Sequence, residues 1–122
     1  MSQSVTLEET AALLQKADHI LLLTHQYPDG DTIGSGYALC QALQSLGKTA
    51  RVACSDEIPG KYAYMTEPVP SPTFEPSFIC AVDVADAKLL GPRLEPYADR
   101  VDLAIDHHAS HRDFQRYLLL DA

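Results

Sequence analysis

Apolar residues along this chain are grouped in short blocks, separated by polar stretches or by stretches rich in proline and glycine. Five blocks have the length of a strand and are apolar almost throughout, which is typical of strands buried on both faces. These predicted strands are residues 19–25, 49–55, 77–83, 101–106 and 116–122.

Two longer segments between these blocks have helical spacing. Thr6 and Glu9 have the spacing of a capping box, and apolar residues follow at helical intervals. After the first predicted strand, Asp31 or Thr32 can cap a second helix, for which Gly47 is a suitable end. Both helices are therefore expected to pack on the sheet.

The remaining connections are shorter or interrupted. Residues 60–65 are expected to form a single helical turn, and residues 67–76, with four prolines, an extended loop. Residues 85–100 have helical character interrupted at Gly91 and Pro92. Buried strands that alternate with helices predict an α/β fold: a parallel sheet of about five strands with helices on both faces.

Polar side chains gather where the predicted strands end. In chain order these residues are His25, Asp29 and Asp31, then Asp83, then Asp106, His107 and His108. Ligands of such sheets bind beyond the carboxyl ends of the strands, so we expect these groups to share one edge. Carboxylates and imidazoles suit Mn²⁺, Mg²⁺, Fe²⁺ or Zn²⁺, and the absence of cysteine from the set argues against a thiolate site.

Each cluster also has an ordinary explanation when it is taken alone. A "PDG" sequence is a common turn, Asp83 could simply end a strand, and "DHH" could be a solvated loop. Three such clusters at three strand ends favour a metal site instead. Two neighbouring ions could activate a water for attack on phosphorus, and the N-terminus of the second helix favours a phosphate oxygen.

In this order, the clusters resemble the motifs of the DHH phosphoesterase superfamily. "THQYPDGDTIGS" is similar to motif one, "AVDVAD" to motif two and "DHH" to motif three, and the resemblance runs from about Ile20 to Ala122. The wording "HxxPDGDTIGS" is most similar to the bacterial bifunctional oligoribonuclease/pAp phosphatase group. That group hydrolyses very short RNAs and 3'-phosphoadenosine 5'-phosphate (pAp) with Mn²⁺.

The resemblance implies two divalent metal ions, expected to be Mn²⁺, and a role for each motif residue. His25 and Asp29 would hold the first ion, Asp31 and His107 would hold the second, and Asp83 would bridge the two.

Two further motif residues are expected to be catalytic. By the same resemblance, His108 would face the substrate phosphate or support a ligand, and Asp106 would orient the histidine pair. His19 precedes the first strand and is interpreted as structural, whereas His111 and Asp113 are interpreted as loop residues.

The chain departs from the family after the third motif. Residues 1–122 are expected to be the N-terminal part of a DHH phosphoesterase domain, without the fourth motif and the C-terminal DHHA1-type substrate domain. Asp121 is not assigned to a metal ion. Such a part is expected to be marginally stable or aggregation-prone and to bind Mn²⁺ weakly. It is also expected to hydrolyse pAp at least about a hundredfold more slowly than its parent, because positioning is lost.

The composition of the chain limits the classes of binding partner that we expect. A net charge of −8 does not suit a broad nucleic-acid groove, but it allows a short oligoribonucleotide or nucleoside bisphosphate held through metal ions. The three cysteines lie in apolar runs, which predicts buried free thiols and a cytoplasmic location. We expect no signal peptide and no membrane partner; a homodimer of the full-length protein stays open.

Two alternatives remain at this stage. The first is another DHH phosphohydrolase: a pyrophosphatase, exopolyphosphatase, cyclic-dinucleotide phosphodiesterase or single-strand exonuclease. The second is a non-catalytic nucleotide-binding α/β module, whose "DGDTIGSG" loop would bind phosphate without metal.

Overall fold

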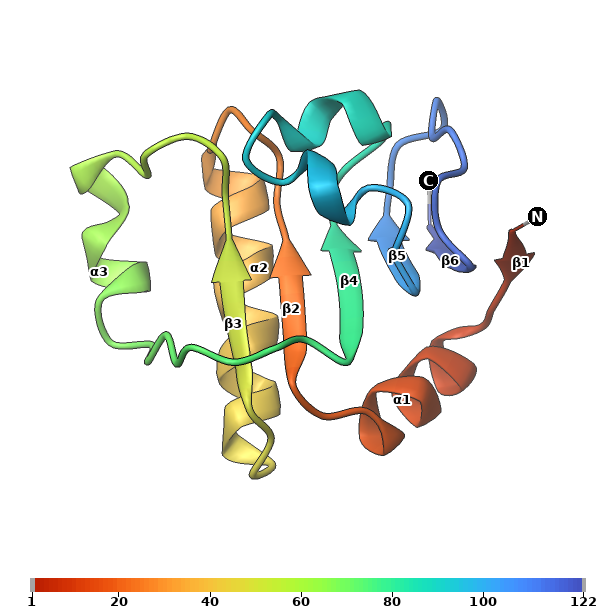
Figure 1. Cartoon of the computed structure of the whole chain (residues 1–122), viewed down its shortest axis with the longest axis horizontal. Helices are drawn as coiled ribbons and strands as arrows, with labels where there is room; N and C mark the ends of the chain where they lie inside the picture. Colours follow the sequence, from red (N-terminus) through yellow and green to blue (C-terminus); the bar gives the residue numbers. More distant parts are fainter. Residues whose placement is uncertain (1, 122) are drawn as a thin grey trace.

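The protein is built on one parallel sheet with the strand order β1-β6-β5-β4-β2-β3 (Figure 1). The computed structural model describes residues 2–121. The strands are β1 (Gln3–Ser4), β2 (Ile20–Leu23), β3 (Ala50–Ala53), β4 (Phe78–Val82), β5 (Leu103–Asp106) and β6 (Tyr117–Leu120). Every pair of neighbouring strands is parallel, which confirms the predicted α/β class.

The sheet has six strands, one more than the five predicted. The additional strand, β1, comprises two exposed residues, Gln3 and Ser4, and forms the edge of the sheet by pairing with β6. No apolar run marks β1 in the sequence, because pairing with β6 rather than burial defines it.

The two long helices form as predicted, with one correction. The helix α1 (Leu7–Lys16) has the expected capping box between Thr6 and Glu9. The helix α2 (Gly30–Ser45) is capped by Asp29, not by Asp31 or Thr32, because the Asp29 carboxylate accepts a hydrogen bond from the Thr32 N–H. Motif one therefore runs directly from the end of β2 into the first turn of α2.

The shorter connections are mostly 3-10 helices. Residues 60–66 form η1 (Gly60–Tyr62) and α3 (Ala63–Thr66), which confirms the predicted helical turn. Residues 85–100 form only η2 (Ala87–Leu90) and η3 (Glu95–Tyr97), since Pro92 and Pro96 cannot donate the N–H groups of a continuous helix.

Two apolar layers cover the sheet. On one face, Leu14 of α1 and Cys40 and Leu43 of α2 pack on alternate residues of the central strands. On the other face, the segment with η2 and η3 packs through Leu90 and Leu94. The prediction of helices on both faces is confirmed, although 3-10 helices cover the second face.

The central strands are fully enclosed, so only their ends can present polar groups. All four residues of β2 are 0% exposed. The three cysteines are free thiols, of which Cys40 and Cys80 are buried and Cys54 is half-buried. Burial raises the pKa of Cys40 to about 11 and that of Cys80 to about 12. Within residues 2–121, no helix has the length and apolar character needed to cross a bilayer.

Candidate metal centre

Four side chains converge where β4 and β5 end. Asp83, Asp106, His107 and His108 each offer one ligand atom, and these atoms all lie within 4.8 Å of one another. The two strands are paired, and the Asp83 N–H continues the ladder by donating to the Ile105 carbonyl at 2.9 Å. The apolar strands therefore deliver the second and third motifs to the same point.

Asp83 occupies a strained position in this group. Its φ of 62° lies in the left-handed region, which side chains other than glycine rarely adopt. Its Oδ1 atom is buried and lies 2.7 Å from His107 Nε2, but no well-formed hydrogen bond reaches it. Burial raises the pKa of Asp83, and the neighbouring histidines only partly offset this effect.

Asp106, unlike Asp83, has hydrogen-bond partners at both carboxylate oxygens. Its side chain is 0% exposed, and its Oδ1 atom accepts hydrogen bonds from the backbone N–H groups of His107 and His108 at 2.8 and 3.3 Å. His108 Nδ1 lies 2.6 Å from the same oxygen, and His111 Nδ1 lies 2.6 Å from Oδ2. Burial would raise the pKa of Asp106, but these hydrogen bonds outweigh it and hold the pKa below its ordinary value of 3.8.

The two histidines of the third motif stack on each other and reach solvent. Their ring centroids are 4.4 Å apart, and their side chains are 60% (His107) and 39% (His108) exposed. Because the ionised Asp106 can only accept, His108 donates from Nδ1 and leaves Nε2 for a ligand. The hydrogen bond to Asp106 raises the pKa of His108, with further contributions from the charges of Asp106, Asp83 and Asp29.

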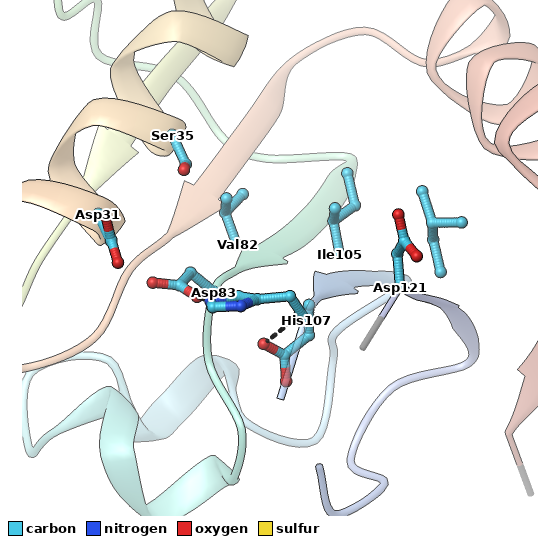
Figure 2. Close-up of a pocket in the computed structure, with 9 residues that line it drawn as sticks. Asp31, Ser35, Val82, Asp83, Ile105, His107 and Asp121 are labelled. Carbon is cyan, nitrogen blue, oxygen red and sulfur yellow. Dashed lines mark hydrogen bonds and ion pairs between the residues drawn. The ribbon is translucent and has the colours of Figure 1, made fainter. Parts of the chain in front are cut away.

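A pocket of about 450 Å³ opens beside this group. Its lining residues are Asp31, Ser35, Val82, Asp83, Ile105, Asp106, His107, Leu119 and Asp121. Figure 2 shows Asp31 and Ser35 projecting from α2 toward the end of β4 that carries Asp83. One wall is therefore acidic and comes from the first motif, and the opposite wall includes Leu119 and Asp121 of the last strand and its end.

The remaining residues of motif one lie outside the group of four. Asp29 uses its carboxylate to cap α2, and His25 Nδ1 accepts a hydrogen bond from the Tyr27 N–H at 3.0 Å. Neither residue lines the pocket, although the charge of Asp29 acts on His108. The assignment of His25 and Asp29 to a first ion stays a prediction, as does the division of the other ligands between two ions.

Three residues of this region were not assigned to it from the sequence. Ser35 and Asp121 line the pocket, and the side chain of His111, although in a loop as predicted, is 1% exposed and bound to Asp106. Only the path of the loop after β5 brings His111 back to Asp106, so sequence spacing gave no signal. His19, which we interpreted as structural, lies away from this group. Its carbonyl accepts a hydrogen bond from the Ser77 N–H, at the opposite ends of the strands.

The donor set fits a divalent cation. Carboxylate oxygens and imidazole nitrogens are the ligands preferred by Mn²⁺ and similar ions, and no thiolate belongs to the group. The strongest observation is the buried Asp83 Oδ1, which receives no well-aligned hydrogen bond and has His107 Nε2 at 2.7 Å, because a buried carboxylate oxygen needs a cation or a donor. Asp83 and His107, with Asp31 across the pocket, are the residues best placed to hold such an ion.

Comparisons with known proteins agree with this architecture. An exopolyphosphatase-related protein from Bacteroides fragilis has a similar fold, with a TM-score of 0.77 and 24% sequence identity. The similarity covers 93% of this chain and 37% of that protein's chain, so this chain spans well under half of that relative. The sequence model of the DHH family, N-terminal domain, matches residues 19–120. This match includes all three motifs and most of the chain, and the chain therefore belongs to the DHH family.

Proposed function

We propose that this chain carries the metal site of a phosphoesterase that uses two divalent ions, expected to be Mn²⁺. The observation that carries the proposal is the group formed by Asp83, Asp106, His107 and His108, in which a buried Asp83 oxygen lacks a hydrogen-bond partner. Bound divalent ions would supply electrophilic activation of the phosphoryl group and of the attacking water.

In this proposal, each carboxylate has a distinct task. Asp83 would hold both ions, and it lines the pocket from a left-handed backbone conformation. Asp31 and His107, which both line the pocket, would hold the second ion, and His25 and Asp29 would hold the first. Asp106 stays ionised and positions the histidine pair.

His108 contacts the substrate phosphate in this proposal. Its Nδ1 is bound to Asp106, so Nε2 is the free atom. Because its pKa is raised, this nitrogen keeps its proton to a higher pH than an ordinary histidine does. His108 is thus suited to donate a hydrogen bond to a phosphate oxygen.

The proposed substrates are short oligoribonucleotides, pAp, or both. The support for this choice is the resemblance of "HQYPDGDTIGS" to motif one of the oligoribonuclease/pAp phosphatase group. The pocket of about 450 Å³ has the size of a site for a small ligand, and a net charge of −8 opposes binding of long nucleic acids. A cytoplasmic location is part of this proposal, since the three cysteines are free thiols.

A substrate panel tests the proposal on the full-length gene product that contains this chain. The panel comprises pAp, a diribonucleotide, pyrophosphate, polyphosphate and a cyclic dinucleotide, each with Mn²⁺, with Mg²⁺ and with a chelator. We expect Mn²⁺-dependent hydrolysis of pAp or the diribonucleotide to be fastest. Faster hydrolysis of polyphosphate or pyrophosphate would change the proposed substrate, but the protein would still be assigned as a phosphohydrolase. Nucleotide binding that survives the chelator, without hydrolysis, would favour the non-catalytic module.

A further inference from the structure

One buried imidazole lies beside the site but outside the three motifs. His111 follows the DHH run in the loop between β5 and β6, and its side chain is 1% exposed. His107 and His108, by contrast, are 60% and 39% exposed. A histidine enclosed to this degree must direct both ring nitrogens at partners.

Each ring nitrogen of His111 faces an oxygen. Nδ1 lies 2.6 Å from Asp106 Oδ2, and Nε2 lies 2.9 Å from Gln115 Oε1. Gln115 Oε1 also accepts from the Phe114 N–H, and its Nε2 donates to Ser2 Oγ, so Oε1 is the acceptor toward His111. His111 is therefore held between two oxygens, one at each ring nitrogen.

The contacts of Asp106 are divided between its two oxygens. Oδ1 accepts the bonds that define the DHH turn: the N–H groups of His107 and His108, and His108 Nδ1. Within residues 2–121, the only side chain bonded to Oδ2 is His111. A carboxylate fixed at one oxygen can still rotate, whereas a carboxylate fixed at both oxygens cannot.

The loop that carries His111 is itself anchored. The His111 N–H donates to the His108 carbonyl at 3.1 Å, and the Arg112 N–H donates to the Ala85 carbonyl at 2.7 Å. The His111 ring also stacks on Phe114 with centroids 5.6 Å apart. The imidazole is thus a rigid support and not a mobile loop side chain.

We propose that His111 is a positioning residue, which fixes Asp106 through Oδ2 so that Oδ1 holds His108 in the orientation that presents Nε2 to the phosphate. The consequence for catalysis rests on the proposed function. The consequence for the His108 ring does not, because it can be measured in the metal-free chain.

Two amide variants separate this role from simple packing. His111→Asn places an amide N–H near the position of Nδ1 and can keep the bond to Asp106. His111→Gln places its amide near the position of Nε2, so it can keep the contact to Gln115 but loses the bond to Asp106. A packing role predicts that the larger glutamine is tolerated better, whereas the positioning role predicts the reverse order.

The first measurement is hydrolysis by the full-length gene product. For His111→Gln we expect kcat to fall by about 30-fold with KM within about twofold, the size usual for losing a partner that orients a site residue. His111→Asn should keep kcat within about threefold. Arg112→Gln, at an exposed neighbour in the same loop, should match the wild type. Equal losses in the two His111 variants, or a loss only in His111→Asn, would overturn the proposal.

The second measurement needs no activity. In the metal-free chain, nitrogen NMR of the His108 ring reports its bond to Asp106, and this signal should shift in His111→Gln and stay in His111→Asn. An unchanged signal in a folded His111→Gln would contradict the proposal even if the enzyme's substrate were misassigned. If His111→Gln fails to fold, Gln115→Met removes the outer acceptor of His111 together with the other bonds of the Gln115 amide, and leaves the bond between His111 and Asp106 in place. An unchanged His108 signal and kcat in that variant would also contradict the proposal.

Discussion

The ends of β4 and β5 differ sharply, although both carry an aspartate next to the same histidine pair. At the end of β5, Asp106 is fully enclosed and both of its oxygens are hydrogen-bonded. At the end of β4, Asp83 sits in a left-handed conformation, and its buried Oδ1 has no hydrogen-bond partner. The fold satisfies one carboxylate internally and leaves the other for a ligand.

The pKa shifts of the two carboxyl groups express the same difference. Burial dominates at Asp83 and raises its pKa, whereas at Asp106 the hydrogen bonds overcome burial and lower it. Ionised Asp83 is therefore costly to the metal-free fold, and ionised Asp106 stabilises it. We therefore propose that Asp83 serves as a cation ligand and Asp106 as an internal support.

The largest effect is expected at the end of β4. Asp83→Asn removes the carboxylate proposed to bridge the ions, so the proposed metal-dependent hydrolysis should fall by at least about a thousandfold, or roughly 4 kcal/mol of barrier. The metal-free variant should be at least as stable as the wild type, because asparagine tolerates a positive φ and carries no buried charge. Hydrolysis rates and urea unfolding measure the two quantities.

A charge-matched control completes this test. Asp56 is exposed, and Asp56→Asn should change neither activity nor stability. If Asp83→Asn unfolded more easily than the wild type in the absence of metal, Asp83 would be a structural residue like Asp106.

The next effect is expected at the end of β5. Asp106→Asn replaces a charged carboxylate that accepts four hydrogen bonds by a neutral amide with one acceptor oxygen, so these bonds cannot all be kept as they are. The free energy of unfolding should fall by about 3 kcal/mol. Urea unfolding of the metal-free chain measures the loss. Unchanged stability would remove the distinction between the two ends.

Most of the difference between Asp83 and Asp106 could not be predicted from the sequence. The apolar runs predicted the strands of the sheet core, and their shared direction predicted that the second and third motifs meet at one edge. Yet Asp83 and Asp106 look alike in sequence, since each follows a buried strand. Their difference depends on a backbone dihedral angle and on the loop path that returns His111 to Asp106.

The wrong prediction of the N-cap of α2 has a similar origin. Asp29, Asp31 and Thr32 are all residue types that can cap a helix, and only the observed bond from the Thr32 N–H identifies Asp29. Likewise β1 has no apolar pattern, because it exists through pairing with β6.

A smaller effect is expected across the pocket, at Asp31. Asp31 is exposed in the first turn of α2 and lines the same pocket as His107. Asp31→Asn should weaken Mn²⁺ binding to the chain by about tenfold, which corresponds to roughly 1.4 kcal/mol. Stability should fall by less than about 1 kcal/mol, the usual value of a charge at a helix N-terminus. Calorimetry with MnCl₂ and urea unfolding report the two changes, and unaltered Mn²⁺ affinity would confine the metal site to the ends of β4 and β5.

The smallest expected effect is on the pH dependence of stability, to which Asp83 and Asp106 should contribute with opposite sign. Because the folded-state pKa of Asp106 is lowered, its contribution is present above the ordinary value of 3.8 and is lost as the pH falls through the folded value. Because the folded-state pKa of Asp83 is raised, its contribution is present below 3.8 and is lost as the pH rises through the folded value. The two slopes oppose each other in the metal-free wild type.

Removing one carboxyl group at a time should therefore reveal the slope of the other. In urea unfolding of the metal-free chain between about pH 3 and pH 5.5, Asp83→Asn should gain stability relative to the wild type as the pH rises, and Asp106→Asn should lose it. The contribution of His108 stays constant in this range, since its pKa is raised from 6.5. Saturating Mn²⁺ should reverse the slope that depends on Asp83, because a bound cation favours the ionised carboxylate. If stability depended on pH in the same way in the two variants, both aspartates would have a purely structural role. The proposal of a metal ion at the end of β4 would then be wrong.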